Sequence, residues 1–206
     1  MEVEIVLAFC AAAFLLALMP GPDNIYVLSL SISNGSRQGI GLTTGLVSGV
    51  VVHTLLAATG LSIVLYSSDL VFSLVKYAGA IYLIYLAYGE SQDRVNTLTA
   101  LETENLGIGK LYRQGVLMNV LNPKVSLFFI ALLPQFISSP GWNPMIQMSI
   151  LGLIFMLIAF LTFSSIALVA GRLSQLVEND KFWIITKWVK VGVLVILALT
   201  LALSSK

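Results

Sequence analysis

Charged side chains are scarce in this sequence. Only 10% of its 206 residues are Asp, Glu, Lys or Arg, whereas 58% are apolar. A soluble domain carries about 25% charged residues. A water-soluble fold also needs polar side chains over its surface, and this chain has too few of them for its length. The composition therefore predicts an integral membrane protein.

Cysteine, histidine and net charge are scarce as well. The single cysteine, Cys10, cannot form an internal disulfide, and together with the single histidine, His53, it gives no metal-site spacing. A net charge of +1 gives no bulk attraction for nucleic acid. The phosphate-binding pattern GxxxxGKS/T is absent. We therefore expect no metal, no cofactor, no nucleic-acid partner and no nucleotide-driven step.

The N-terminus lacks the basic region of a secretory signal peptide. Glu2 and Glu4 stand there instead, and the apolar run after them leads into MPGPDN rather than a small-residue cleavage site. We therefore expect this segment to be retained as a membrane helix.

Long apolar segments are what the chain does contain. A membrane-spanning helix needs about 20 mostly apolar residues. Six segments meet this length: 5–31, 41–65, 70–89, 114–136, 145–170 and 184–204. The sequence therefore predicts an all-α integral membrane protein with one domain, 1–206. It consists of a three-helix unit (1–89), a polar cytoplasmic loop (90–113) and a second three-helix unit (114–206).

The two three-helix units resemble each other. GPDNIYVLSL in the first helix aligns with NPKVSLFFIAL in the fourth, which sets Asp23 opposite Lys124. Because each unit has an odd number of helices, the second copy must enter the membrane inverted relative to the first. Inverted repeats are a transporter architecture, with the substrate site near the membrane midplane between the repeats.

The distribution of Lys and Arg predicts the orientation. If the N-terminus is outside, the cytoplasmic side receives Arg37, Arg94, Lys110, Arg113, Arg172, Lys181, Lys187 and Lys190. The outer side then keeps only Lys76 and Lys206. Cytoplasmic loops carry the excess of positive residues in membrane proteins, so we expect both termini outside.

Proline interrupts two of the predicted helices. The first span contains Pro20, Gly21 and Pro22, and the fourth contains Asn122, Pro123 and Lys124. Proline lacks an N–H and clashes with the preceding turn, so both helices are expected to break or kink. Broken helices persist in a membrane where they are buried or line a wet cavity. The alternative is a packing kink without a functional role.

Two charged residues lie inside the interrupted helices. A charge at the bilayer centre costs about 2.5–3.5 kcal/mol on insertion scales, so it usually faces a partner or a cavity. We hypothesise that Lys124 binds a substrate carboxylate and that Asp23, followed by the polar Asn24, binds an ammonium group or a transported proton. The alternatives are a purely structural ion pair, or Asp23 as a cap of the resuming helix.

His53 falls within the second predicted helix. It is either a proton relay or substrate ligand, or a neutral imidazole bonded to a neighbouring helix. Ser48 lies five residues before His53, and residues at that spacing are rotated off one helix face. A nucleophile and its base must lie within hydrogen-bond reach. We therefore reject an intramembrane serine protease and expect no catalytic residue.

Small and amide side chains complete the set of candidates. Gly41, Gly45 and Gly49 recur at every fourth position, which lets helices approach closely. We expect them to pack against the broken first helix or a second subunit. Asn119 and Asn122 are three residues apart and share a helix face. They either satisfy backbone groups freed at the proline or point at substrate.

Several of these motifs occur together in one known family. MPGPDN with downstream LNPK, SLFFIALLPQFI and KYAGAIYLIYLAYG resembles the lysine/threonine exporter superfamily of bacterial inner membranes, over nearly the whole chain. The resemblance implies amino-acid efflux driven by the proton-motive force. The family's motif positions correspond to Pro20, Gly21, Pro22, Asn122, Pro123 and Lys124.

One segment and one departure bear on the substrate that the resemblance implies. GLVSGVVVHTLLAATGLS is similar to the homoserine/threonine branch, which handles neutral amino acids and related lactones. Many relatives have Asn where this chain has Asp23. That residue therefore either tunes substrate or proton coupling or only replaces a cap.

The leading hypothesis is thus a multi-pass secondary exporter of neutral amino acids. Its partners would be the amino acid and membrane lipid, and a homodimer is left open. The alternatives are export of another small solute or cation, or a membrane scaffold subunit whose buried charges serve assembly alone.

Overall fold

The computed structural model describes residues 2–19, 21–61, 69–92, 106–138, 141–177 and 180–203. Within these residues 92% are helical and none is in a strand. The predicted all-α class is therefore confirmed for this part of the chain. Pro20, one of the predicted site residues, lies outside the described residues.

The first predicted span is a bent pair of helices. α1 (Val3–Leu18) is followed by α2 (Pro22–Asn34), and the two axes differ by 57°. Pro22 takes the first position of α2, where its missing N–H removes no helical hydrogen bond. The predicted interruption at the proline motif is confirmed.

The third predicted span is a continuous helix, and the second is helical up to residue 61, after which residues 62–65 lie outside the described residues. α3 (Ser36–Leu56) begins before the predicted residue 41 and continues into a π-helix, η1 (Ala57–Leu61). Gly35 allows this early start, because its φ of 88° suits glycine and reverses the chain directly after α2. The third helix, α5 (Asp69–Gln92), contains the predicted segment 70–89.

The fourth predicted span is bent like the first. α6 (Ile108–Val120) is followed by α7 (Pro123–Leu127), a π-helix η2 (Phe128–Leu132) and a 3₁₀-helix η3 (Leu133–Phe136). The chain bends by 49° where Pro123 starts α7. The second interruption at a proline motif is therefore also confirmed.

The predicted loop 90–113 is too long. Residues 90–92 are the end of α5, and residues 108–113 are the first turns of α6, where Leu111 is fully buried. The polar composition misled the prediction because α6 buries only a narrow apolar stripe and exposes its charged side chains, such as Lys110 and Arg113. Residues 93–105 lie outside the described part of the chain.

Three to five candidate membrane spans are identified in the described residues. α8 (Pro144–Val177) and α9 (Asp180–Leu203) complete the element order. Three unbroken segments, in α3, α8 and α9, are long and apolar enough to cross a bilayer, and the two bent pairs raise the count to five. The third predicted span, 70–89, lies within α5, which packs along α9 and is not among these candidates.

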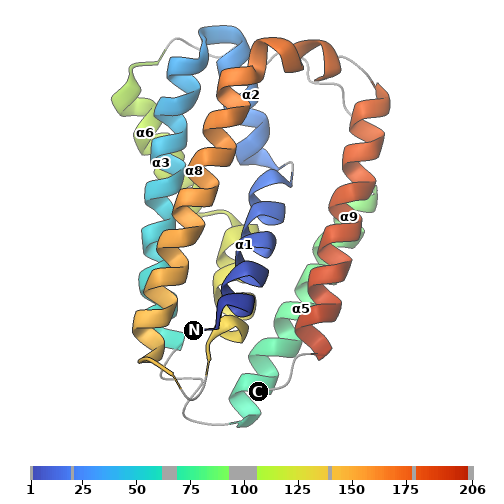
Figure 1. Cartoon of the computed structure of the whole chain (residues 1–206). Coiled ribbons are helices and arrows are strands. Elements are labelled where there is room, and N and C mark those ends of the chain that lie inside the picture. The colour runs from blue at the N-terminus through green and yellow to red at the C-terminus, as the bar shows by residue number, and fades with distance from the viewer. Residues whose placement is uncertain are drawn as a thin grey trace.

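The bent pairs pack with α3 and α8 into the body of the molecule, while α5 and α9 pack mainly against each other along one side (Figure 1). α1 begins and α9 ends at the same end of the bundle, whereas α3, α6 and α9 all begin at the opposite end (Figure 1). The two helix breaks therefore lie between the ends, inside the bundle.

Glycines bring α3 and α6 into direct backbone contact. A Cβ added at Gly45 would collide with the backbone carbonyl of Tyr112, and one added at Gly115 would collide with that of Leu42. The predicted close packing is confirmed, but the partner of the α3 stripe is α6 rather than the first helix. The reason is that α6 supplies a matching glycine at the crossing point.

Candidate functional site

The two helix breaks meet in the interior. Asp23 is the second residue of α2 and Lys124 is the second residue of α7, so each directly follows the proline that starts its helix. Nδ2 of Asn122 donates a hydrogen bond to Oδ2 of Asp23 at 2.7 Å. Asp23 is 2% exposed and Asn122 is 7% exposed. The structure therefore brings the two proline motifs together, as the alignment of the halves suggested.

Asn122 also caps α7. Its backbone is extended, and its Oδ1 accepts a hydrogen bond from the backbone N–H of Lys124 at 3.0 Å. An Asn in this position satisfies one of the donors that a helix start leaves unpaired. Asn122 thus serves the backbone at the break, and the same side chain ties the start of α7 to the start of α2.

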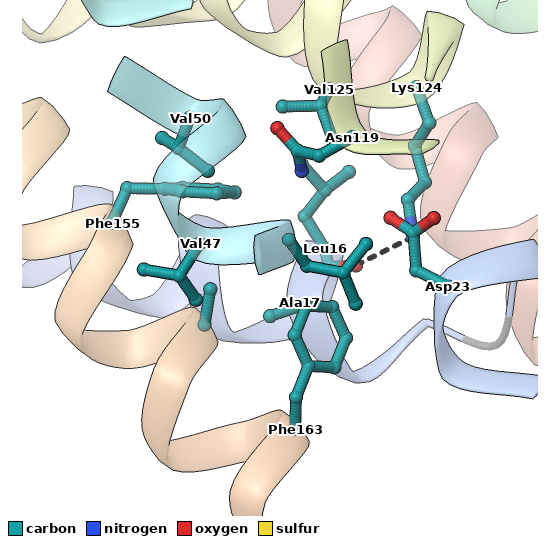
Figure 2. Close-up of a pocket in the computed structure, with 12 residues that line it drawn as sticks. Leu16, Ala17, Asp23, Val47, Val50, Asn119, Lys124, Val125, Phe155 and Phe163 are labelled. Atoms are coloured by element: carbon teal, nitrogen blue, oxygen red, sulfur yellow. Dashed lines mark hydrogen bonds between the residues drawn. The ribbon is translucent and has the colours of Figure 1, made fainter. Parts of the chain in front are cut away.

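Lys124 reaches across to the end of α1. Its Nζ donates to the carbonyl oxygens of Leu16 and Met19, each at 3.2 Å. The Leu16 carbonyl lacks its usual helical donor, because the residue four positions later, Pro20, has no N–H. A cation at a helix C-terminus is also favoured by the helix dipole. Figure 2 shows the ammonium end of Lys124 beside the carboxylate of Asp23, and the two charges attract each other.

Asn24 donates to a third carbonyl of the same helix end. Its Nδ2 donates to the carbonyl oxygen of Ala17 at 2.8 Å. Its Oδ1 is buried and has no hydrogen-bond partner within the described residues. Asn24 therefore holds α2 against α1 and retains an unused acceptor.

A small cavity lies against this junction (Figure 2). Its polar lining consists of Asp23, Asn119 and Lys124, and the rest of the lining is apolar. The space in the cavity that the centre of a water molecule can occupy is only about 10 Å³. That is roughly enough for one water molecule. A solute as large as an amino acid would fit only after the surrounding side chains had moved apart.

Asn119 contributes a buried acceptor to the cavity. The residue is 2% exposed, and its Oδ1 makes no hydrogen bond to any described residue. A buried acceptor without a donor is costly, so such an atom points to a ligand or water that supplies one. This Oδ1 lies against Gly49 of α3, where an added Cβ would be 2.9 Å from it, and the two roles given for Asn119 stay predictions.

His53 lies next to the site without lining the cavity. Its Nε2 is 3.1 Å from the carbonyl oxygen of Asn119, and its ring packs against Phe129 with centroids 5.9 Å apart. The contact joins α3 to the end of α6. The geometry matches the interpretation of His53 as an imidazole bonded to a neighbouring helix.

Two parts of the site were missing from the sequence prediction. Phe155, Ala159 and Phe163 of α8 line the cavity, and their spacing of four residues is the available signal, because it places them on one helix face. The carbonyl of Leu16 was also missed. Its signal is the proline at position 20, which removes the N–H that this carbonyl would otherwise receive.

Comparisons with known proteins identify the family. Residues 14–205 match the model of the LysE type translocator family. The chain is 30% identical over 176 residues to a homoserine/homoserine lactone efflux protein of Salmonella typhimurium, which covers 84% of each chain. It is 31% identical over 185 residues to the uncharacterized membrane protein YrhP of Bacillus subtilis, covering 85% of this chain and 88% of that protein. No solved structure matches. The chain belongs to the LysE type translocator family.

Proposed function

We propose that this translocator exports small neutral amino acids of the threonine and homoserine type across the bacterial inner membrane, driven by the proton-motive force. The observation that carries the proposal is the pair Asp23 and Lys124, one from each half of the chain. They lie at the two helix breaks and line one cavity, with Asp23 buried and Lys124 half-buried. The function named for the Salmonella relative agrees with it.

The chemistry of the cavity fits a zwitterion. Lys124 offers a positive charge to a carboxylate, and Asp23 offers a negative charge to an ammonium group or to the transported proton. The side-chain amide of Asn119 adds an uncharged polar group to the lining. The remaining lining carries no further charge, which favours a substrate with an uncharged side chain.

The arrangement of the helices supports a membrane orientation with both termini outside. α3, α6 and α9 begin at one end of the bundle, and this end carries Arg37, Lys110, Arg113 and Lys181 close to those helix starts (Figure 1). A concentration of Lys and Arg marks the cytoplasmic side. In this proposal α5 provides the sixth crossing beside α9.

An inverted repeat is consistent with the contacts between elements. α3 of the first half packs against α6, which begins the broken helix of the second half, and α8 of the second half packs against α1, which begins that of the first. α5 and α9, the last helices of the halves, pack against each other. If the two halves are interchanged, the α3–α6 contact becomes the α8–α1 contact, and the α5–α9 contact maps onto itself. A two-fold relation between the halves requires this correspondence.

Efflux from loaded cells tests the function. A bacterial strain without its own threonine and homoserine exporters is loaded with labelled homoserine, threonine or lysine, and the label released is measured with and without a protonophore. We expect the protein to accelerate the release of homoserine and threonine more than that of lysine. The protonophore should abolish this acceleration. Unchanged release of all three would reject the proposal in favour of a scaffold or an exporter of another solute.

A further inference from the structure

The ammonium of Lys124 sits in a cage of oxygen atoms at the first helix break. The carbonyl oxygens of Leu16 and Met19 accept its hydrogen bonds at 3.2 Å, and the carboxylate of Asp23 lies beside it (Figure 2). All three groups belong to the first half of the chain, whereas Lys124 arrives from the second half. The cage is therefore built by one bent helix pair and filled by the other.

Gly21 gives the ammonium its space. A Cβ added at this glycine would lie 3.3 Å from Nζ of Lys124, closer than most real side-chain contacts, and 3.9 Å from the Met19 carbonyl oxygen. The extended backbone at Gly21 is open to any residue, with φ −150°. The absence of a side chain here is therefore explained by room for the cation and not by backbone strain.

Backbone carbonyl oxygens at unwound helix ends are ligands that broken-helix transporters use for sodium, and carboxylate oxygens are ligands of hard cations in general. Such oxygens bind a hard cation whether it is a metal ion or an ammonium group, because both interact through positive charge. The two cations differ in one respect here, since the ammonium is tethered to α7 and is present at all times.

We propose that Lys124 is a built-in cation that occupies an alkali-metal type of site between the two halves. The inference deepens the proposed function, on which it rests for the role of the site. It has two consequences. The protein as it stands needs no sodium for its stability or for transport, and removal of the lysine head group turns the cage into a site that sodium ions can enter.

Thermal unfolding of purified protein tests the proposal without any transport measurement. The probe is NaCl, compared with choline chloride at the same ionic strength, for the native chain, Lys124→Ala and the double variant Lys124→Ala/Asp23→Asn. We expect equal midpoints in both salts for the native chain. For Lys124→Ala we expect a saturable rise of about 3–6 °C at a tenfold excess of sodium over its dissociation constant. The double variant should lose most of this rise, because it lacks the anionic oxygen.

The controls make each outcome decisive. Lys110→Ala removes an exposed lysine of α6 and should behave like the native chain. If Lys124→Ala is lost during purification in choline, Lys124→Ser, whose short side chain also leaves the cage empty, carries the same expectation. Three outcomes would each overturn the inference. The single variants could have the same unfolding midpoint in both salts, they could be lost during purification in both salts, or the native chain could be stabilised by sodium specifically. Failure of homoserine efflux with a positive sodium response would reject the proposed function alone.

Discussion

The two helix breaks have similar angles, 57° and 49°, but they are closed by different kinds of contact. At the second break the partners are close in sequence: Asn122 caps α7, and its N–H donates to the Asn119 carbonyl at 2.9 Å. At the first break, Gly21 provides no side-chain cap, and the nearby Asn24 donates to the Ala17 carbonyl alone. There, Lys124 supplies hydrogen bonds from more than a hundred residues away.

The second break is therefore stabilised largely by its own residues. The first break depends on the other half of the chain for the hydrogen bonds to its Leu16 and Met19 carbonyls. In a membrane, water is not available to satisfy the freed carbonyls, so the dependence is strong. A change at Lys124 should therefore disturb the first break more than the second. Movement of Lys124 would also displace the end of α1, because the two are joined by hydrogen bonds. Such a coupling suits a protein whose cavity must open.

Lys124→Ala is expected to have the largest effect. It removes the donor from the Leu16 and Met19 carbonyls and leaves the buried Asp23 without its cation, and an uncompensated buried charge costs about 3–5 kcal/mol. The α7 cap is retained, because it uses the backbone N–H of residue 124. We expect homoserine efflux to fall below about a tenth of the native rate, measured at equal membrane abundance. Lys110→Ala is the matched control, and native efflux in Lys124→Ala would contradict the prediction.

Substitutions at Asn122 should have an intermediate effect and separate its two bonds. Asn122→Ser keeps a capping oxygen and loses the bond to Asp23, which costs about 1.5–3 kcal/mol for a charged acceptor. Asn122→Ala also loses the cap, for about 1 kcal/mol more. Denaturation of the purified variants in detergent should therefore rank native, Ser and Ala in falling stability. Equal stabilities of Ser and Ala would mean that the local cap does not hold the second break.

His53→Phe is expected to have the smallest effect. The Asn119 carbonyl that His53 contacts also accepts the N–H of Asn122, so it keeps a partner. We expect a loss of stability of about 1 kcal/mol or less and efflux at roughly half the native rate or more. The same efflux and denaturation measurements check this. Efflux reduced to the level seen with a protonophore would instead assign His53 to the proton pathway.

Much of the architecture was predictable because it depends on covalent chemistry and composition. Apolar segments predicted the helices, and the missing N–H of Pro22 and Pro123 predicted where two of them break. The limits of α6 were not predictable in the same way. Its exposed charges resemble a loop, and only its packing through Gly115 onto α3 makes it a buried helix.

The site was predictable in its charges and not in its contacts. Two ionisable residues within apolar helices must find partners, so Asp23 and Lys124 could be singled out and paired. Two contacts could not be predicted, because they depend on the packing of segments far apart in the chain. Lys124 donates to carbonyls of α1, and the glycines of α3 pack against α6.

The amino-acid sequence by itself determined that this is a helical membrane protein with two proline breaks and an acid and a base beside them, because those features follow from local residue chemistry. Tertiary structure alone decided which carbonyls hold Lys124, which side chains of α8 face the cavity and how small that cavity is. The physical reason is that these properties depend on how closely two helices approach, and a local sequence pattern contains no information on that distance.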